Sequence, residues 1–443
     1  MPFLLQARRL VLQPRLLLRS LLLLLLLLRS LLPSQPPSQL RRSDLASPRR
    51  AIGPAVMNGN FSSVQEDPNV LAERMSRIEP SGIRRIFELM TTMDDPINLS
   101  IGQPHFDPPE ALIEAACRAI RAGKNRYTVT QGLPALNQRL LFDVARRFGR
   151  RPDSCLITAG VSGGLVLSFL ALLDPGDEIL LPDPGFMMYR NLAAVVGAVP
   201  RFYSTYPRTP GGRFQIDALE IEAKITDRTR VLFLNSPSNP TGAVLSLDEI
   251  KVACEIANRR GLVVISDEIY DSFVYDSEFH SPVSHAEQCV QLGGFSKTFG
   301  VPGWRMGYAT GPQKILDAMK TLQQFSFVCA PAPFQHALLE AAFDVDMGPH
   351  IVDYQRRRDL ITAQLHPRYA LRPPEGSFYA FPQLPKGQKG ADFLQHAIDK
   401  NLLIVPGNAF SARDTHFRLS FAADDATLAR GITALNQLAI ELP

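Results

Sequence analysis

The sequence predicts an α/β protein, with a large domain built on a mostly parallel sheet flanked by helices and a smaller α+β domain. From about residue 110 to 271, helical patterns alternate with short apolar runs, and after about residue 328 this alternation stops. The chain has 443 residues, 45% of them hydrophobic and 20% charged, which is typical of a globular protein with two domains.

The elements of the large domain follow one another along the chain. We expect helices over residues 110–122, 134–148, 163–173, 189–196 and 247–260. We expect strands over residues 154–158, 178–181, 230–235 and 262–267. These strands are too apolar to have a face in water, which indicates a parallel sheet covered on both sides. Ligands of such sheets bind at the carboxyl ends of the strands.

The C-terminal part shows a different pattern. We expect helices over residues 332–344, 352–365 and 392–401, and short extended segments over 377–381, 402–405 and 416–421. The segment 95–106 is expected to complete this part. The predicted division is therefore a tail over residues 1–56, a small domain from 57–107 with 329–443, and a large domain over 108–328.

The N-terminal tail carries the basic charge of the chain. Residues 1–56 hold nine arginines and one acidic residue, Asp44, whereas the rest holds 38 basic and 42 acidic residues. The body is therefore not expected to bind nucleic acid. The leucine run Leu21–Leu28 is too short to cross a bilayer, so we expect no stable membrane partner. An export signal, an organelle transit peptide and a sequence start upstream of the working Met57 all stay open, and we expect the tail to be disordered or not native.

Cysteine and histidine spacing argues against a metal site and against disulfides. The five cysteines are scattered without CxxC spacing, and the eight histidines lack paired metal-ligand spacing. Reduced thiols are typical of the cytoplasm, where we place the protein, with organelle targeting by residues 1–56 left open.

A lysine among small residues is the first candidate site residue. Lys297 follows Ser296 in a loop punctuated by Gly and Pro, and Arg305 comes eight positions later. Lysine condenses with carbonyl groups once its neutral amine is accessible, and arginine presents a fork of donors to a phosphate. Taken singly, such a lysine is more often a solvated surface residue. The pair indicates a covalent amine beside an anion site.

Polar side chains follow two of the predicted strands. The strand over 262–267 ends in Asp267, with Tyr270 three residues later, and the strand over 230–235 leads into an N-P-T-G turn that holds Asn239. A buried carboxylate can keep a ring nitrogen of a ligand protonated, although this aspartate could equally cap the next helix. The turn alone is more often structural than functional.

Two further segments suit an anion and a ring. Val161 and Ser162 precede a helix expected to begin near residue 163, and free N–H groups at a helix N-terminus attract anions. Phe186 follows a strand and a turn, where its ring could stack on a ligand. A lone aromatic residue in that position is more often part of the core.

Arg418 completes the set. It lies opposite the apolar side chains of the alternating segment 416–421, so it needs a carboxylate partner from a ligand or from this chain.

Four motifs together resemble the class I/II aminotransferases, which are fold-type-I enzymes dependent on pyridoxal phosphate (PLP). In their order and spacing along the chain, these motifs are N-P-T-G, D-E-x-Y, S-K-x-x-x-x-x-G-x-R and R-L-S-F. The resemblance runs from about Gly82 to the C-terminus.

The resemblance implies the PLP-dependent transferase fold and a role for each residue. Lys297 would form the Schiff base, Asp267 would pair with the pyridine nitrogen, and Tyr270 would contact the ring oxygen. The implied cofactor-binding residues are Val161, Ser162, Phe186, Asn239, Asp267, Tyr270, Lys297, Arg305 and Tyr127, the last from the partner subunit of a homodimer with shared active sites. The implied substrate-binding residues are Gly102, Asn239 and Arg418. No metal is implied.

Two positions depart from the family pattern. Gly294 stands where a serine commonly binds the phosphate, and Gln103 stands where the family has an acidic residue. Neither departure removes a catalytic group.

The implied activity moves an amino group from an L-amino acid, with aspartate or an aromatic amino acid preferred, to a 2-oxo acid such as 2-oxoglutarate. A C–S β-lyase is an alternative because the same site can run elimination. A PLP-sensing regulator is disfavoured, because residues 1–80 leave no room for a DNA-binding module. Arg84 could bind the second carboxylate of aspartate, and Phe325 and Phe327 could line an aromatic pocket or lie in the core.

Overall fold

The computed structural model describes residues 71–78, 86 and 90–442. The chain divides into two units, Met1–Asp67 and Pro68–Pro443, and the described residues all belong to the second. The predictions for residues 1–56 lie outside the described residues. Within the described part, no helix is both long and apolar enough to cross a membrane.

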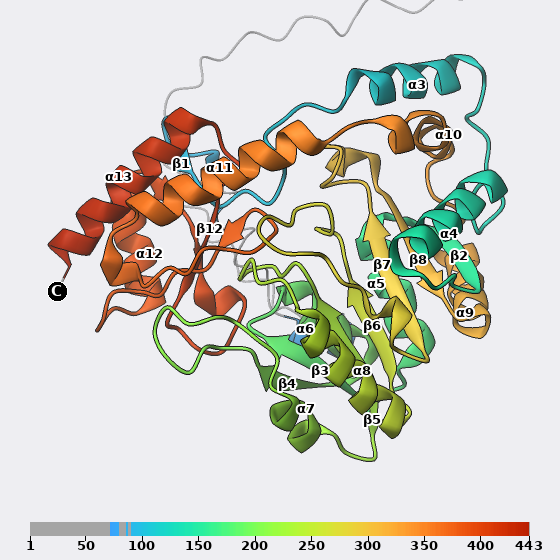
Figure 1. Cartoon of the computed structure of the whole chain (residues 1–443), viewed down its shortest axis with the longest axis horizontal. Coiled ribbons are helices and arrows are strands. Elements are labelled where there is room, and N and C mark those ends of the chain that lie inside the picture. The colour runs from blue at the N-terminus through green and yellow to red at the C-terminus, as the bar shows by residue number, and fades with distance from the viewer. Residues whose placement is uncertain (1–70, 79–85, 87–89, 443) are drawn as a thin grey trace, which may run out of the picture. The chain divides into compact units, whose positions relative to one another are not determined.

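A seven-stranded sheet forms the centre of this unit (Figure 1). In spatial order its strands are β2 (Ser154–Ala159), β8 (Met306–Gly311), β7 (Cys289–Gly294), β6 (Val263–Asp267), β5 (Thr229–Asn235), β3 (Glu178–Asp183) and β4 (Val199–Ser204). β8 runs antiparallel to β2 and β7, and the other neighbouring pairs are parallel. The α/β class with a mostly parallel sheet is therefore confirmed, although β4, β7 and β8 were not predicted.

Helices cover both faces of the sheet because its central strands are apolar on both sides. In β5, Val231 and Phe233 belong to one buried cluster, whereas Leu232 and Leu234 belong to another. Apart from helices of the C-terminal part, the first cluster includes residues of α5 (Gly160–Leu172), α6 (Met187–Val196) and α9 (Gln313–Ser326). The second includes residues of α7 (Ala218–Lys224) and α8 (Leu247–Arg260), together with Val144.

Local sequence signals set the ends of α8. Ser246 and Glu249 form a capping box that satisfies free N–H groups at its start. Gly261 ends the helix in the left-handed conformation, with φ 65°. A further group of helices packs beside β2 through a third cluster, namely α3 (Glu110–Arg121), α4 (Pro134–Phe148) and α10 (Ala332–Ala341).

The C-terminal part holds two small sheets. β1 (Ile97–Asn98) pairs in parallel with β10 (Leu402–Leu403). The other sheet has the order β11 (Val405–Pro406), β12 (Phe417–Ser420) and β9 (Tyr379–Ala380), all antiparallel. Three helices lie in this part, namely α11 (Gly348–Gln364), α12 (Gly390–Asp399) and α13 (Asp425–Glu441). The domain boundaries at residues 107 and 329 stay a prediction.

One helix boundary was wrong in a way that matters for the site. The helix predicted over 163–173 begins at Gly160, which adopts φ +70°. Glycine reaches this left-handed region without steric cost, so the chain turns from β2 directly into α5. Val161 and Ser162 therefore lie inside the first turn of the helix.

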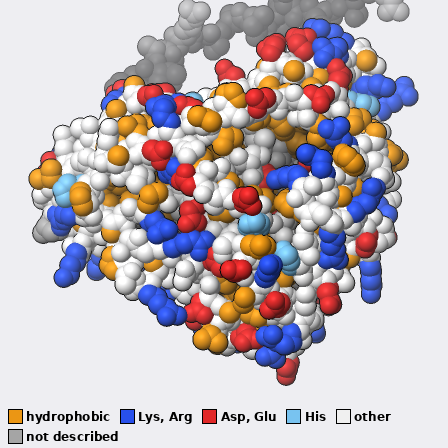
Figure 2. All heavy atoms as spheres, viewed as in Figure 1, with side chains coloured by type: hydrophobic (Ala, Val, Ile, Leu, Met, Phe, Trp, Pro, Cys, Tyr) orange, Lys and Arg blue, Asp and Glu red, His pale blue; other side chains and the backbone are white. Residues whose placement is uncertain are grey.

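On the face in Figure 2, positive and negative side chains are interspersed, in keeping with the near balance of charge in the body.

Candidate active site

A cavity of about 310 Å³ lies at the carboxyl ends of β5, β6 and β7. The predicted site residues that line it are Gly102, Val161, Ser162, Phe186, Asn239, Asp267, Tyr270, Lys297, Arg305 and Arg418. The structure thus brings together side chains that are far apart in the sequence. Tyr127 is the one predicted residue that does not line the cavity.

Lys297 follows β7 and is partly buried in the cavity. Its Nζ donates a hydrogen bond of 2.6 Å to the backbone oxygen of Gly102. Burial lowers the pKa of the amine to about 8, and the nearby guanidinium groups of Arg418 and Arg305 act in the same direction. The lysine is therefore deprotonated far more easily than an exposed one, which makes it an available nucleophile and base.

Asp267, the last residue of β6, faces the same cavity. Its Oδ2 accepts a hydrogen bond of 2.8 Å from the hydroxyl of Tyr189, and its Oδ1 accepts one of 3.2 Å from the N–H of Ile269. Burial raises the pKa of this carboxyl to about 6, while Tyr189 lowers it. Asp267 is thus mostly ionised at neutral pH and held in one orientation. A turn and not a helix follows Asp267 among the described residues, so the helix-cap alternative is wrong, although the Ile269 contact has the form of a cap bond.

The start of α5 and Arg305 together form a corner for an anion. No acidic side chain lies in the first turn of α5, and no side chain caps it. A Cβ built on Gly160 would lie 2.7 Å from Nη2 of Arg305, so the guanidinium lies against the helix start. Free N–H groups, the helix dipole and a guanidinium all favour an anion at this point.

Gly294 departs from the family pattern for a packing reason. A Cβ built there would lie 2.6 Å from Cδ1 of Ile269 and 2.9 Å from Cγ2 of Val161. These distances are shorter than normal carbon contacts, so these neighbours already fill the space of a serine side chain. Ser296 lines the cavity and offers a hydroxyl there instead.

Arg418, on β12, is 2% exposed and has room for a ligand. Its Nη1 donates to Oδ1 of Asn239 at 3.0 Å and its Nη2 donates to the backbone oxygen of Ser100 at 2.8 Å. Its buried Nε has no hydrogen-bond partner, and among the described residues no carboxylate pairs with it. A buried guanidinium without an anion carries a free-energy cost that a ligand carboxylate would relieve.

Two tyrosines that the sequence did not single out belong to the site. Tyr189 holds Asp267, and Tyr379 lies between Tyr270 and Arg418, with its Oη 3.1 Å from the Oη of Tyr270. Both contacts join residues far apart in the chain, so no local pattern could have found them. Phe186 is half-buried at the cavity wall and packs edge-on against Tyr189, at 5.8 Å between ring centroids.

Tyr127 lies on the surface. Its side chain is 83% exposed, as is that of Phe325, while Val129 and Phe327 are 53% and 39% exposed. The two aromatic residues at 325 and 327 therefore lie neither in the core nor in the cavity, contrary to both sequence-based interpretations. Arg84 lies outside the described residues.

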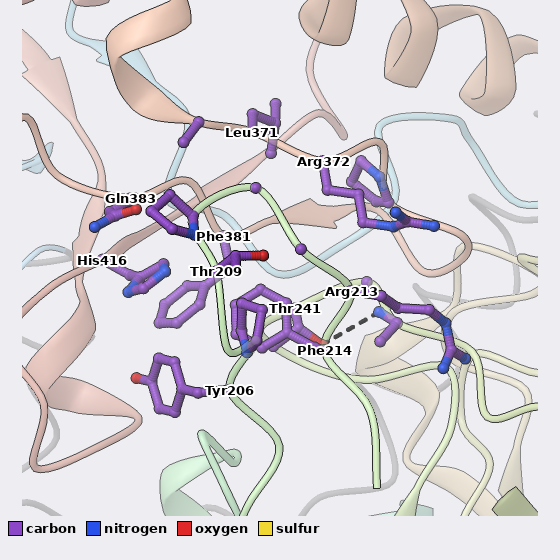
Figure 3. Close-up of a pocket in the computed structure, with 18 of the residues that line it drawn as sticks. Tyr206, Thr209, Arg213, Phe214, Thr241, Leu371, Arg372, Phe381, Gln383 and His416 are labelled. Carbon is purple, nitrogen blue, oxygen red and sulfur yellow. Dashed lines mark hydrogen bonds between the residues drawn. The ribbon is translucent and has the colours of Figure 1, made fainter.

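A second cavity, of about 230 Å³, shares no lining residue with the first. Tyr206, Phe214, Phe381 and His416 form an aromatic part of its wall (Figure 3). No lysine, serine or cysteine lines it, and its one acid, Glu375, pairs with Arg213. The reactive groups therefore belong to the first cavity.

A readily deprotonated lysine in a cavity suits covalent catalysis on carbonyl and amino compounds. The α/β fold and this cavity thus define an enzyme of that class. The profile of the family "Aminotransferase class I and II" matches residues 94–435. The chain therefore belongs to the class I and II aminotransferases, and it is a transaminase.

Individual relatives agree with this assignment. A probable aspartate aminotransferase of Methanocaldococcus jannaschii is 34% identical over 376 residues, which are 82% of this chain and 98% of the relative. An aromatic-amino-acid aminotransferase of Thermococcus litoralis is 30% identical over 80% of this chain and 94% of the relative. The solved structure of N-succinyldiaminopimelate aminotransferase from Mycobacterium tuberculosis has a TM-score of 0.78 and 29% identity, covering 83% of this chain and all of that chain (100%).

Proposed function

We propose that this transaminase works with PLP held at Lys297 and moves the amino group of aspartate or of an aromatic amino acid to a 2-oxo acid such as 2-oxoglutarate. The observation that carries the proposal is the lowered pKa of the Lys297 amine, about 8, inside a cavity that also holds Asp267 and Arg418. The family name and the names of the relatives support the same chemistry.

The residues present fit the cofactor. Val161, Ser162 and Arg305 would hold the phosphate, because the start of α5 and the guanidinium favour an anion and no acidic side chain lies in the first turn of the helix. Asp267 would hold the proton of the ring nitrogen, and Phe186 would face the ring. When bound, PLP would supply an electron sink for the bond broken at the substrate Cα.

Binding and proton transfer would then fall to the chain. Arg418 and Asn239, with the backbone at Gly102, would bind the substrate carboxylate and so fix the direction of the Cα–H bond. The Nζ of Lys297 would take the proton from the substrate Cα and deliver it to the carbon of the bound cofactor that carries the transferred nitrogen. Ionised Asp267 would keep the ring nitrogen protonated throughout.

The cavity wall bears on the donor. Lys297, Arg305 and Arg418 are the cations that line it in the described part of the chain, and each already has a proposed partner. An aromatic side chain would meet Ile101, Leu165 and Met188, which also line the cavity. Aspartate would need a further cation for its second carboxylate, from Arg84 or from a second copy of the chain.

We also propose a homodimer with shared active sites. The exposed apolar side chains of Tyr127, Val129, Phe325 and Phe327 support it, and the two segments are joined by a hydrogen bond of 2.6 Å from Gln323 to the backbone oxygen of Thr130. A Cβ on Gly163, in the first turns of α5, would be 3.7 Å from Phe327, so this surface adjoins the anion corner. Tyr127 of a second copy could reach the phosphate from there.

The decisive experiment is a spectral titration of the full chain with PLP. Addition of aspartate or phenylalanine alone should convert the absorbance of the Lys297-bound cofactor to that of its amine form, and 2-oxoglutarate should reverse the change. The amino acid that works at the lowest concentration identifies the donor. With cysteine added instead, stable absorbance with release of pyruvate, ammonia and sulfide would show a lyase. An unchanged absorbance of covalently bound PLP in Lys297→Ala would refute the assignment of the amine.

A further inference from the structure

Tyr379 contacts Tyr270, which is proposed to bind the cofactor, and Arg418, which is proposed to bind the substrate. It is 1% exposed on β9, which pairs with β12, the strand of Arg418. Its Oη lies 3.1 Å from the Oη of Tyr270, and the guanidinium of Arg418 lies 4.3 Å from its ring centroid.

The hydroxyl of Tyr379 sets the position of the hydroxyl of Tyr270. The Tyr270 Oη has the Tyr379 Oη as its hydrogen-bond partner, and both groups are buried. A Cβ built on Gly102 would lie 2.8 Å from the Tyr379 Oη, so this hydroxyl also touches the backbone that accepts Lys297. A hydroxyl that accepts from one tyrosine can donate to it once that tyrosine donates elsewhere.

The ring of Tyr379 provides a surface for the guanidinium of Arg418. Phe410 provides a second one, at 5.0 Å from the ring centroid. Stacking between aromatic rings fixes the plane of a guanidinium that lacks an anionic partner. The orientation of the unpartnered Nε therefore depends on the ring of Tyr379.

We propose that Tyr379 is a positioning residue that aims Tyr270 at the cofactor ring oxygen through its hydroxyl and aims Arg418 at the substrate carboxylate through its ring. The inference rests on the proposed function, because it assigns Tyr379 a part in binding the same cofactor and substrate. The other charged and titratable groups that face Tyr270, Tyr379 and Lys297 are Asp267, Tyr189, Arg305 and Arg418.

Two substitutions separate the two roles. Tyr379→Phe keeps the ring and removes the hydroxyl, so Tyr270 becomes a weaker donor to the ring oxygen. A weaker donor stabilises the oxygen charge less in the deprotonated chromophore, and the pH midpoint of the PLP absorbance at Lys297 should rise by about 0.5 unit. Tyr379→Leu also removes the surface under Arg418, and should weaken binding of propionate roughly tenfold.

Tyr369→Phe is the matched control. Tyr369 is also fully buried, and its hydroxyl donates to the backbone oxygen of Leu435, away from the cavity. This variant should lose stability without a change in the midpoint or in propionate affinity. The proposal is overturned if Tyr379→Phe keeps the wild-type midpoint while Tyr379→Leu keeps the wild-type affinity for propionate.

A cofactor-free measurement separates this proposal from the proposed function. In protein without PLP, the losses of unfolding free energy in Tyr270→Phe and Tyr379→Phe should be less than additive in the double variant, because each removes the same hydrogen bond. Additive losses would overturn the contact itself. Absence of any PLP absorbance in the wild type, together with a non-additive cycle, would overturn the proposed function while keeping the coupling of the two tyrosines.

Discussion

Burial determines the chemistry of single side chains in the cavity. Desolvation lowers the pKa of Lys297 to about 8 and raises that of Asp267 to about 6. Both pKa values are therefore closer to neutral pH than those of exposed groups, one from above and one from below. At pH 7, roughly 10% of the Lys297 amine is neutral, compared with roughly 0.03% for an exposed lysine. The amine can thus react near neutral pH, while Asp267 still carries most of its charge.

The pH dependence of cofactor capture follows from the lowered pKa. The neutral amine is the reactive form, so its fraction rises with pH until the folded-state pKa is passed. The rate at which cofactor-free protein captures PLP should therefore rise and level off above about pH 8, the pKa of the Lys297 amine. Stopped-flow absorbance from pH 6 to 11 measures this rate. A rise that continues to the pKa of an exposed lysine would contradict the effect of burial, and Lys297→Ala should show no capture.

Tyr189→Phe tests the contact that holds Asp267. The Tyr189 hydroxyl stabilises the ionised carboxylate, so its loss should raise the pKa of Asp267 further, by up to about one unit. A carboxyl with a raised pKa is protonated at higher pH, and the acid limb of kcat/KM should move upward. Tyr203→Phe is the control, because its hydroxyl donates to the backbone of Phe233 outside the cavity. An unmoved acid limb in Tyr189→Phe would contradict this role.

At the level of secondary structure, hydrophobic periodicity predicted the elements whose apolar residues recur at regular spacing. The helices over 134–148 and 247–260 have the predicted bounds, because their apolar residues recur at helical spacing. β7 and β8 were missed, because each contains glycines near Lys297 that are typical of a loop. Gly293 and Gly294 pair with β8, and neighbouring side chains leave no space for a Cβ at either position. That is a tertiary effect which the local sequence does not record.

The same reasoning explains the candidate site. Motifs at strand ends predicted Asp267, Asn239 and Lys297, since topology brings such ends together. Tyr189 and Tyr379 were missed because their roles come from contacts with residues 78 and 109 positions away. Long-range pairs leave no local signal in a single sequence.

Gly160→Ala tests how α5 begins. Both Gly160 and Gly261 have left-handed φ values, but only at Gly160 would a Cβ meet another residue, Arg305. Alanine at either position should lower the free energy of unfolding by about 1 kcal/mol. Only Gly160→Ala should also weaken PLP affinity, by roughly tenfold, because it displaces the guanidinium from the anion corner. Chemical denaturation and fluorescence titration measure the two effects, and equal PLP affinity in both variants would refute the corner.

At the level of the whole molecule, the exposed apolar surface around Tyr127 and Phe325 is the feature that a single copy leaves unexplained. Phe325→Asp should convert the proposed homodimer to a monomer, because a buried unpaired charge opposes association. Sedimentation measures the state. Leu219→Asp, on α7 and 75% exposed, is the control and should leave the dimer intact. A wild-type protein that sediments as a monomer would contradict the shared active sites.

One stretch of backbone serves two chemically different cations. The backbone oxygens of Ser100 and Gly102 accept hydrogen bonds from Arg418 and Lys297, respectively. These two acceptors are only two residues apart, just after β1. A shift of this segment would change the grip on the substrate acid group and the resting position of the reactive nitrogen in the same step. If Arg418 and Lys297 have the proposed roles, substrate capture and nucleophile release would be linked through a segment that has no reactive group of its own.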